Sequence, residues 1–174
     1  MPQHFGPENA RLTVRTGRSG AASKAGHDLL IEVGSWEATL DADAQPALTL
    51  TADSRSFRVL EGTGGMKGLD DDDKANIAQT VNDEVLKGTP IEFRSNSVQR
   101  SADGRKLTCQ GELELRGKRA PVTFELSIGE DGRLTGQTTV KQTAHGIKPY
   151  SALFGALKVA DEVRVAIEAD YGLG

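Results

Sequence analysis

The side chains that could carry acid–base or metal chemistry are few in this chain. Its three histidines are His4, His27 and His145, and Cys109 is its single cysteine. One cysteine makes neither an intrachain disulfide nor a thiolate cage for zinc, and a histidine-rich metal site would have to recruit the N-terminal His4. His27 precedes Asp28, but neighbouring residues of a strand point to opposite faces, so the two do not form a base with its orienting carboxylate. We therefore expect no metal site.

The common catalytic motifs are missing from the sequence as well. The chain has no Gly-x-Ser-x-Gly elbow, no His-Glu-x-x-His motif and no phosphate-binding loop. These observations favour a binding protein that is not an enzyme and carries no cofactor. A small barrel enzyme, or a haem binder that uses His27 or His145, is the alternative.

Composition and charge narrow the classes of partner. The 174 residues are 37% hydrophobic and 26% charged, with both signs present, which is typical of one soluble globular domain. The net charge of -4 argues against nucleic acid as a partner. No stretch approaches the ~20 apolar residues that span a bilayer, and residues 1–10 lack the apolar run of a secretory signal. We expect a cytoplasmic protein without an integral membrane segment, and a homodimer is compatible with the sequence.

The elements that must position any site are β-strands, because apolar and polar residues alternate along most of the chain. After a flexible N-terminus at 1–10, a single domain at 11–174 is predicted. Its alternating segments are 11–17, 29–40, 46–52, 91–95, 107–115, 122–128, 134–140 and 163–171. Eight antiparallel strands with one apolar face each can close a lipocalin-like barrel wide enough for one ligand, with an open sandwich as the alternative. The parity of the alternation changes at Gly34 and Ser35, where a β-bulge would bend one long strand.

Two segments have helical spacing instead. Residues 74–87 carry Ile77, Val81 and Val85 on one stripe, and Asp70 to Asp73 precede them, where negative charge interacts favourably with a helix N-terminus. A loose calcium site or a protease recognition sequence is the alternative for the aspartates. Residues 150–157 have apolar side chains at i, i+3, i+4 and i+7, which predicts a short apolar helix across one mouth of the barrel.

Four motifs, taken in order, resemble the landmarks of the YceI-like family. They are Gly26-His27-Asp28-Leu29, the segment 88–95, the segment 111–119, and His145-Gly146-Ile147 followed by 159–163. The resemblance spans about residues 11–171. It implies a lipocalin-like antiparallel barrel that holds a polyisoprenoid chain, such as a quinone tail or an isoprenoid phosphate, in an elongated apolar cavity. We expect the chain to depart from many members in lacking a signal peptide, and it carries Thr143-Ala144-His145 where they have an arginine–aspartate pair.

A tunnel for such a ligand needs aliphatic walls and a few polar groups at one end. The residues expected to line it are Phe93, Leu107, Leu113, Phe124, Leu126, Val140, Phe154 and Leu157. The residues expected near a phosphate or quinone headgroup, because they lie at strand ends or in connections, are Lys24, His27, His145, Lys148 and Tyr150. The predicted function is non-enzymatic binding of an isoprenoid-like lipid for storage, transport or stress protection. The alternative is an interaction module whose side chains fill a solid core.

Overall fold

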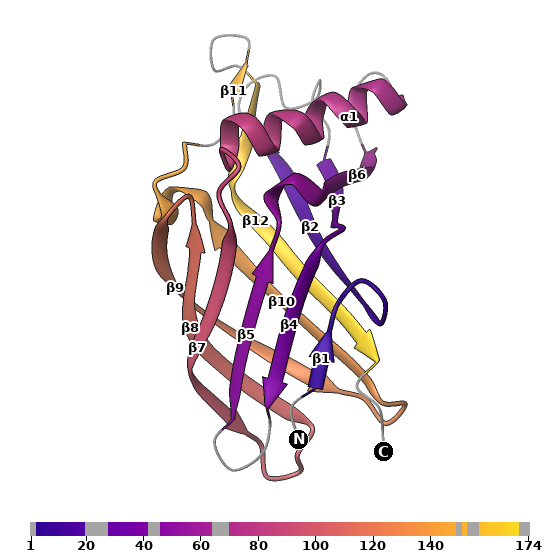
Figure 1. Ribbon diagram of the computed structural model, residues 1–174, viewed down its shortest axis with the longest axis vertical. Helices are drawn as coiled ribbons and strands as arrows, with labels where there is room; N and C mark the ends of the chain where they lie inside the picture. The colour runs from indigo at the N-terminus through magenta and orange to yellow at the C-terminus, as the bar shows by residue number, and fades with distance from the viewer. Residues whose placement is uncertain are drawn as a thin grey trace.

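A computed structural model describes residues 3–19, 28–41, 46–63, 70–148, 151–152 and 157–170. One antiparallel sheet of twelve strands curls around an apolar interior, and a helix lies across its upper end (Figure 1). The strands are β1 Gln3–Phe5, β2 Ala10–Ser19, β3 Asp28–Val33, β4 Trp36–Asp41, β5 Ala47–Ala52, β6 Phe57–Thr63, β7 Ile91–Arg100, β8 Lys106–Leu115, β9 Lys118–Ile128, β10 Arg133–Lys141, β11 Ser151–Ala152 and β12 Leu157–Asp170. The helix α1 is Asp71–Thr80, and three short turns are η2 Ser54–Ser56, η3 Val81–Val85 and η4 Gln142–His145.

The strands predicted at 91–95, 107–115, 122–128 and 134–140 form a meander. Strands β7, β8, β9 and β10 follow one another in the sheet and in the chain. Leu115 pairs with Lys118, so the β8–β9 hairpin has a loop of two residues. These residues, Arg116 and Gly117, have φ of 52° and 74°, the left-handed conformation that two-residue hairpin loops require and that glycine adopts at no steric cost.

The bend predicted at Gly34 and Ser35 is a corner between two strands. Val33 of β3 pairs with Phe57 of β6, and Trp36 of β4 pairs with Ala52 of β5. Across the corner the Gly34 amide donates to the Ser56 carbonyl at 2.9 Å, and the Asp53 amide donates to the Ser35 carbonyl at 3.0 Å. The β3–β6 and β4–β5 ladders therefore meet at this corner.

The predicted count of eight strands is wrong. The segment 29–40 divides into β3 and β4 at the corner, and β1, β6 and β11 were not predicted. The pairing of β3 with β6 shifts register next to Ile31, so Leu60 breaks the alternation of β6. The other two strands are only three and two residues long, too short for a pattern.

Part of the N-terminal segment 1–10, which was predicted to be flexible, forms the strand β1. β1 pairs with β4 in the register Phe5 to Ala38, and the Phe5 side chain is 4% exposed in the core. A strand this short is held by its partner, so its own sequence carries little signal.

The helix predicted at 74–87 is confirmed, with a start three residues earlier. Asp70 caps α1, because its carboxylate accepts from the Asp73 amide at 2.7 Å while the Asp73 carboxylate accepts from the Asp70 amide at 3.2 Å. The run of aspartates therefore contains a capping box. After Thr80 the helix continues as the π-helical turn η3, in which the Leu86 amide donates to the Val81 carbonyl at 2.8 Å. None of the described helices is long and apolar enough to cross a membrane.

The short helix predicted at 150–157 is wrong where the structure describes that segment. Ser151 and Ala152 form β11, which pairs with Lys158 and Leu157 of β12. Tyr150 and residues 153–156 lie outside the described residues. A short apolar run fits a strand as well as a helix, and pairing with another strand decides between them.

Candidate binding cavity

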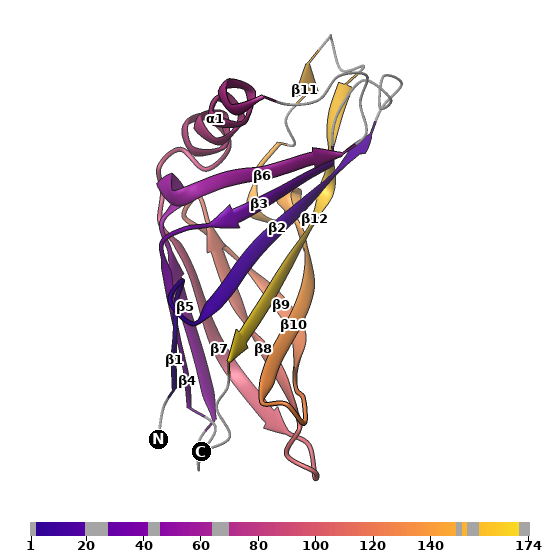
Figure 2. The same cartoon turned by 90° about the vertical axis from the view of Figure 1, so that its right-hand side faces the viewer.

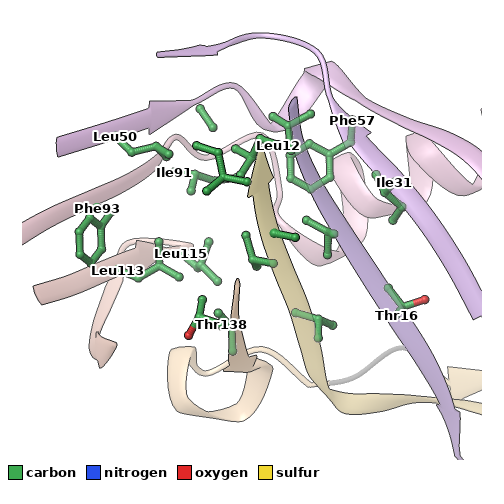
Figure 3. A pocket seen from close by; sticks show the side chains of 18 of the residues that line it. Leu12, Thr16, Ile31, Leu50, Phe57, Ile91, Phe93, Leu113, Leu115 and Thr138 are labelled. Carbon is green, nitrogen blue, oxygen red and sulfur yellow. The ribbon is translucent and has the colours of Figure 1, made fainter. Parts of the chain in front are cut away.

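The concave side of the sheet lines a cavity of about 540 Å³ (Figure 3). Its walls come from residues of eleven strands, among them Leu12 of β2 and Val165 of β12. Because side chains of a strand alternate between faces, most of these lining residues lie two positions apart along their strands. The volume lies within the range of about 300–1,000 Å³ that is typical of small-molecule sites.

The lining of this cavity is almost entirely aliphatic and aromatic. Among the described residues that line it, none is aspartate, glutamate, lysine, arginine or histidine. The polar ones are Thr16, Asn76, Thr80, Gln137, Thr138 and Gln142. Such a surface favours an apolar ligand, because removing apolar area from water contributes about 25 cal/mol per Å².

The helical segment covers the upper end of the cavity. α1 lies above β6 (Figure 2) and packs against it, and Ile77, Val81 and Val85 line the cavity from this side. The segment is anchored at η3, where the Ser54 hydroxyl donates to Asn82 Oδ1 at 3.1 Å. The stripe predicted from helical spacing is thus part of the cavity wall, although its residues were not predicted to contact a ligand.

Five of the eight residues predicted to line a tunnel do line this cavity: Phe93, Leu113, Phe124, Leu126 and Val140. The Phe93 and Phe124 rings also contact each other, with centroids 5.3 Å apart. Leu107 is fully buried in the core and is not part of the cavity lining. Phe154 and the side chain of Leu157 lie outside the described residues. Ligand contact by all eight stays a prediction.

His145 is a buried residue with structural contacts. It is 3% exposed, its Nε2 lies 2.9 Å from the Leu113 carbonyl oxygen, and its Nδ1 lies 3.3 Å from the Lys141 carbonyl oxygen. These contacts hold η4 against β8, and His145 is not among the cavity-lining residues. Lys148 is exposed after η4. Lys24, His27 and Tyr150 lie outside the described residues, so a headgroup role for this set stays a prediction.

Cys109 is the one thiol of the chain, and it is completely buried in β8. Burial raises the pKa of this thiol to about 11, because the thiolate would lose its hydration. The group is therefore a neutral, small apolar side chain at physiological pH, as the alternation of 107–115 indicates.

The polar residues of the cavity are those that sequence reasoning did not assign to the site. Thr16 and Thr138 have the inward parity of their strands, and this signal could have identified them. Gln142 follows the end of β10, where alternation no longer applies, and only the three-dimensional structure places it in the wall.

Comparison with known proteins agrees with this architecture. Residues 31–171 match the YceI-like domain. The fold is similar to the crystal structure of Burkholderia cenocepacia BcnA, with a TM-score of 0.65 and 18% identity over 91% of this chain and 94% of that one. It is also similar to the Campylobacter jejuni YceI protein, with a TM-score of 0.56 and 14% identity over 80% of this chain and 81% of that one. No curated protein matches the sequence.

Proposed function

This chain belongs to the YceI-like family, and we propose that it binds one apolar, isoprenoid-like lipid in its interior cavity without converting it chemically. The observation that carries the proposal is a cavity of about 540 Å³ with no charged side chain among its described lining residues. A prenyl tail buried there loses its contact with water, which is the main source of affinity for an apolar ligand.

The alternatives have less support. A solid core is difficult to reconcile with a cavity of this volume. A histidine-based enzyme or haem site would need an imidazole at the cavity, whereas His145 is not among the lining residues and contacts two backbone carbonyls; His27 lies outside the described residues. Storage, transport and stress protection all fit reversible lipid binding. The cytoplasmic location and the homodimer stay predictions from the sequence.

The test uses two neighbouring residues of β12 that face opposite sides of the sheet. Val165 is half-buried in the cavity wall, and Arg164 is exposed on the outer face. Val165→Trp should place a larger side chain in the cavity and leave less room for a ligand. It should therefore weaken binding of a prenyl quinone at least about tenfold. Arg164→Trp, the matched control, should bind as the unchanged protein does. Native mass spectrometry and a fluorescence titration would measure both.

Two results would contradict the proposal. One is that the unchanged protein takes up no prenyl quinone, prenyl phosphate or isoprenoid hydrocarbon at saturating concentrations. The other is that Val165→Trp, with a normal circular dichroism spectrum, binds as tightly as Arg164→Trp.

A further inference from the structure

The polar lining residues gather at the end of the cavity that α1 covers. Val140, Val163 and Thr16 form one rung across β10, β12 and β2, and Thr138 lies on the next rung, opposite Val165. β12 begins near α1 and runs away from it (Figure 1), so Val163 lies nearer α1 than Ala169 does. The other end of these strands, where Leu134 pairs with Ala169, is lined by apolar residues that include Leu40, Leu48 and Leu126. The end of the cavity beneath α1 therefore combines polar side chains with apolar ones such as Ile77 and Val81, and is called the polar end, whereas the opposite end is apolar.

An irregularity in the pairing of β12 holds the Gln142 side chain at the polar end. The register of β12 with β2 shifts between Val159 and Val163, so Ala160 lies in the irregular part of the ladder. Its carbonyl accepts a hydrogen bond from Gln142 Nε2 at 3.0 Å. Gln142 is 8% exposed, and this bond fixes the orientation of its amide. Among the described residues none donates to its Oε1, which therefore keeps its capacity to accept.

The two threonines supply hydroxyl groups to the same end. Thr16 Oγ1 accepts from the Leu29 amide at 3.3 Å, which leaves its O–H to donate elsewhere. Thr138 makes no side-chain hydrogen bond with the other described residues, and it lies among apolar side chains of the wall in Figure 3. These groups can pair with the carbonyl or hydroxyl oxygens of a ligand.

The charge of the lining decides which kind of headgroup fits. A phosphate buried beside Thr138 and Gln142 would lose its hydration without a cation among the described lining residues to replace it. An uncharged headgroup with carbonyl or hydroxyl groups loses less and gains hydrogen bonds. We propose that Thr16, Thr138 and Gln142 select lipids with an uncharged, oxygen-bearing headgroup, held beneath α1 with the tail toward Leu40 and Leu48. This inference rests on the proposed lipid binding and adds its headgroup class and orientation.

Three probes with prenyl tails of equal length test the headgroup class. They are a prenyl quinone, a prenyl diphosphate and the unsubstituted hydrocarbon, titrated into the unchanged protein. The quinone should bind at least about tenfold more tightly than the diphosphate. Equal or tighter binding of the diphosphate would overturn the inference while leaving lipid binding intact. Failure of all three probes to bind would instead contradict the proposed function and remove the basis of the inference.

Matched variants test the residues themselves. Thr138→Val keeps the shape of the side chain and removes the hydroxyl, and Thr139→Val makes the same change on the outer face of β10. Thr138→Val should weaken quinone binding about three- to tenfold and leave hydrocarbon binding unchanged, whereas Thr139→Val should alter neither. Gln142→Leu should lower the same ratio of quinone to hydrocarbon affinity. If both Thr138→Val and Gln142→Leu leave that ratio unchanged, the assignment of these residues is wrong.

Discussion

At the scale of single residues, the connection between η4 and β12 depends on Thr143 and Asp161 beside the polar end of the cavity. The Asp161 carboxylate accepts from the Thr143 hydroxyl at 2.7 Å and from the Thr143 amide at 2.8 Å. The hydroxyl bond first, and then the amide bond, hold the pKa of Asp161 below its usual value of 3.8, with a smaller contribution from the charge of Lys141. Together with the bond from Gln142 to Ala160, these contacts fix η4 on β12.

This lowered pKa predicts how stability depends on pH. Because the folded-state pKa lies below that of the unfolded chain, ionised Asp161 stabilises the fold above the unfolded value, and this contribution is lost as the pH falls through the folded pKa. Thr143→Val removes the hydroxyl and keeps the amide, so it should raise the pKa of Asp161 toward 3.8. A carboxyl-resolved NMR titration would measure the change.

Asp103 is the internal control for that titration. Its pKa is lowered by the Ser101 hydroxyl and the Arg105 amide, far from Thr143 in the sequence, and should not move in the variant. An unchanged midpoint for Asp161, or an equal shift of both carboxyls, would show that the Thr143 hydroxyl is not the main cause.

At the scale of elements, α1 is the part of the cavity wall with the fewest buried residues. Each of its ten residues keeps some exposure, and its start depends on the capping box of Asp70 and Asp73. Asp70→Ala should therefore weaken α1 locally by about 1 kcal/mol, the usual cost of losing a helix N-cap. Amide hydrogen exchange should show faster exchange in 71–80 and unchanged protection in β8 and β9.

Asp72→Ala is the matched control, because Asp72 is an exposed residue of the same first turn and does not form the capping box. It should change exchange in α1 much less than Asp70→Ala does. Equal effects of the two variants would assign the stabilisation to the charge of the aspartate run instead of the cap.

The elements that sequence reasoning predicted are those whose signal is local. The β8–β9 hairpin combines strict alternation with Arg116-Gly117, and α1 combines helical spacing with a run of aspartates. β6 was missed because the bulge at Leu60 comes from its pairing with β3. Gly111 lies within the alternating segment 107–115, but the need for a glycine at this position is visible only in the three-dimensional structure. A Cβ there would lie 2.2 Å from the Arg94 carbonyl oxygen of β7.

The same distinction applies to the cavity. Phe93, Leu113 and Phe124 were predicted from parity within their own strands, and they line it. Gln142 was not, because its position depends on the carbonyl that a bulge in β12 leaves free. Alternation along a strand predicts which side chains face inward. Irregularities in strand pairing determine where polar side chains lie among the apolar lining residues.

At the scale of the whole molecule, binding in an interior cavity links occupancy to folding. A lipid that contacts β2, β7, β10 and β12 together binds only the folded state, so it stabilises that state by mass action. At a free concentration a hundred times the Kd, a prenyl quinone should raise the free energy of unfolding by about 2.7 kcal/mol. Chemical denaturation with and without the lipid would measure this increase.

The cavity-filling variant provides the comparison for that measurement. Because its binding should be at least about tenfold weaker, Val165→Trp should be stabilised by at most about 1.4 kcal/mol at the same concentration of lipid, whereas Arg164→Trp should respond as the unchanged protein does. Equal stabilisation of all three proteins would place the lipid outside the cavity.

The pairing of β2 with β12 has a consequence for biosynthesis. Ala10 pairs with Ala169, and β12 also pairs with β10 along nine consecutive residue pairs, Arg133 with Asp170 through Lys141 with Glu162. A ribosome releases β12 after the other described strands, so the nascent chain presents the apolar faces of β2 and β10 to the cytosol or to a chaperone while translation continues. Contacts this distant in sequence also make folding slow. The cavity that these strands line is therefore complete only after translation has passed β12.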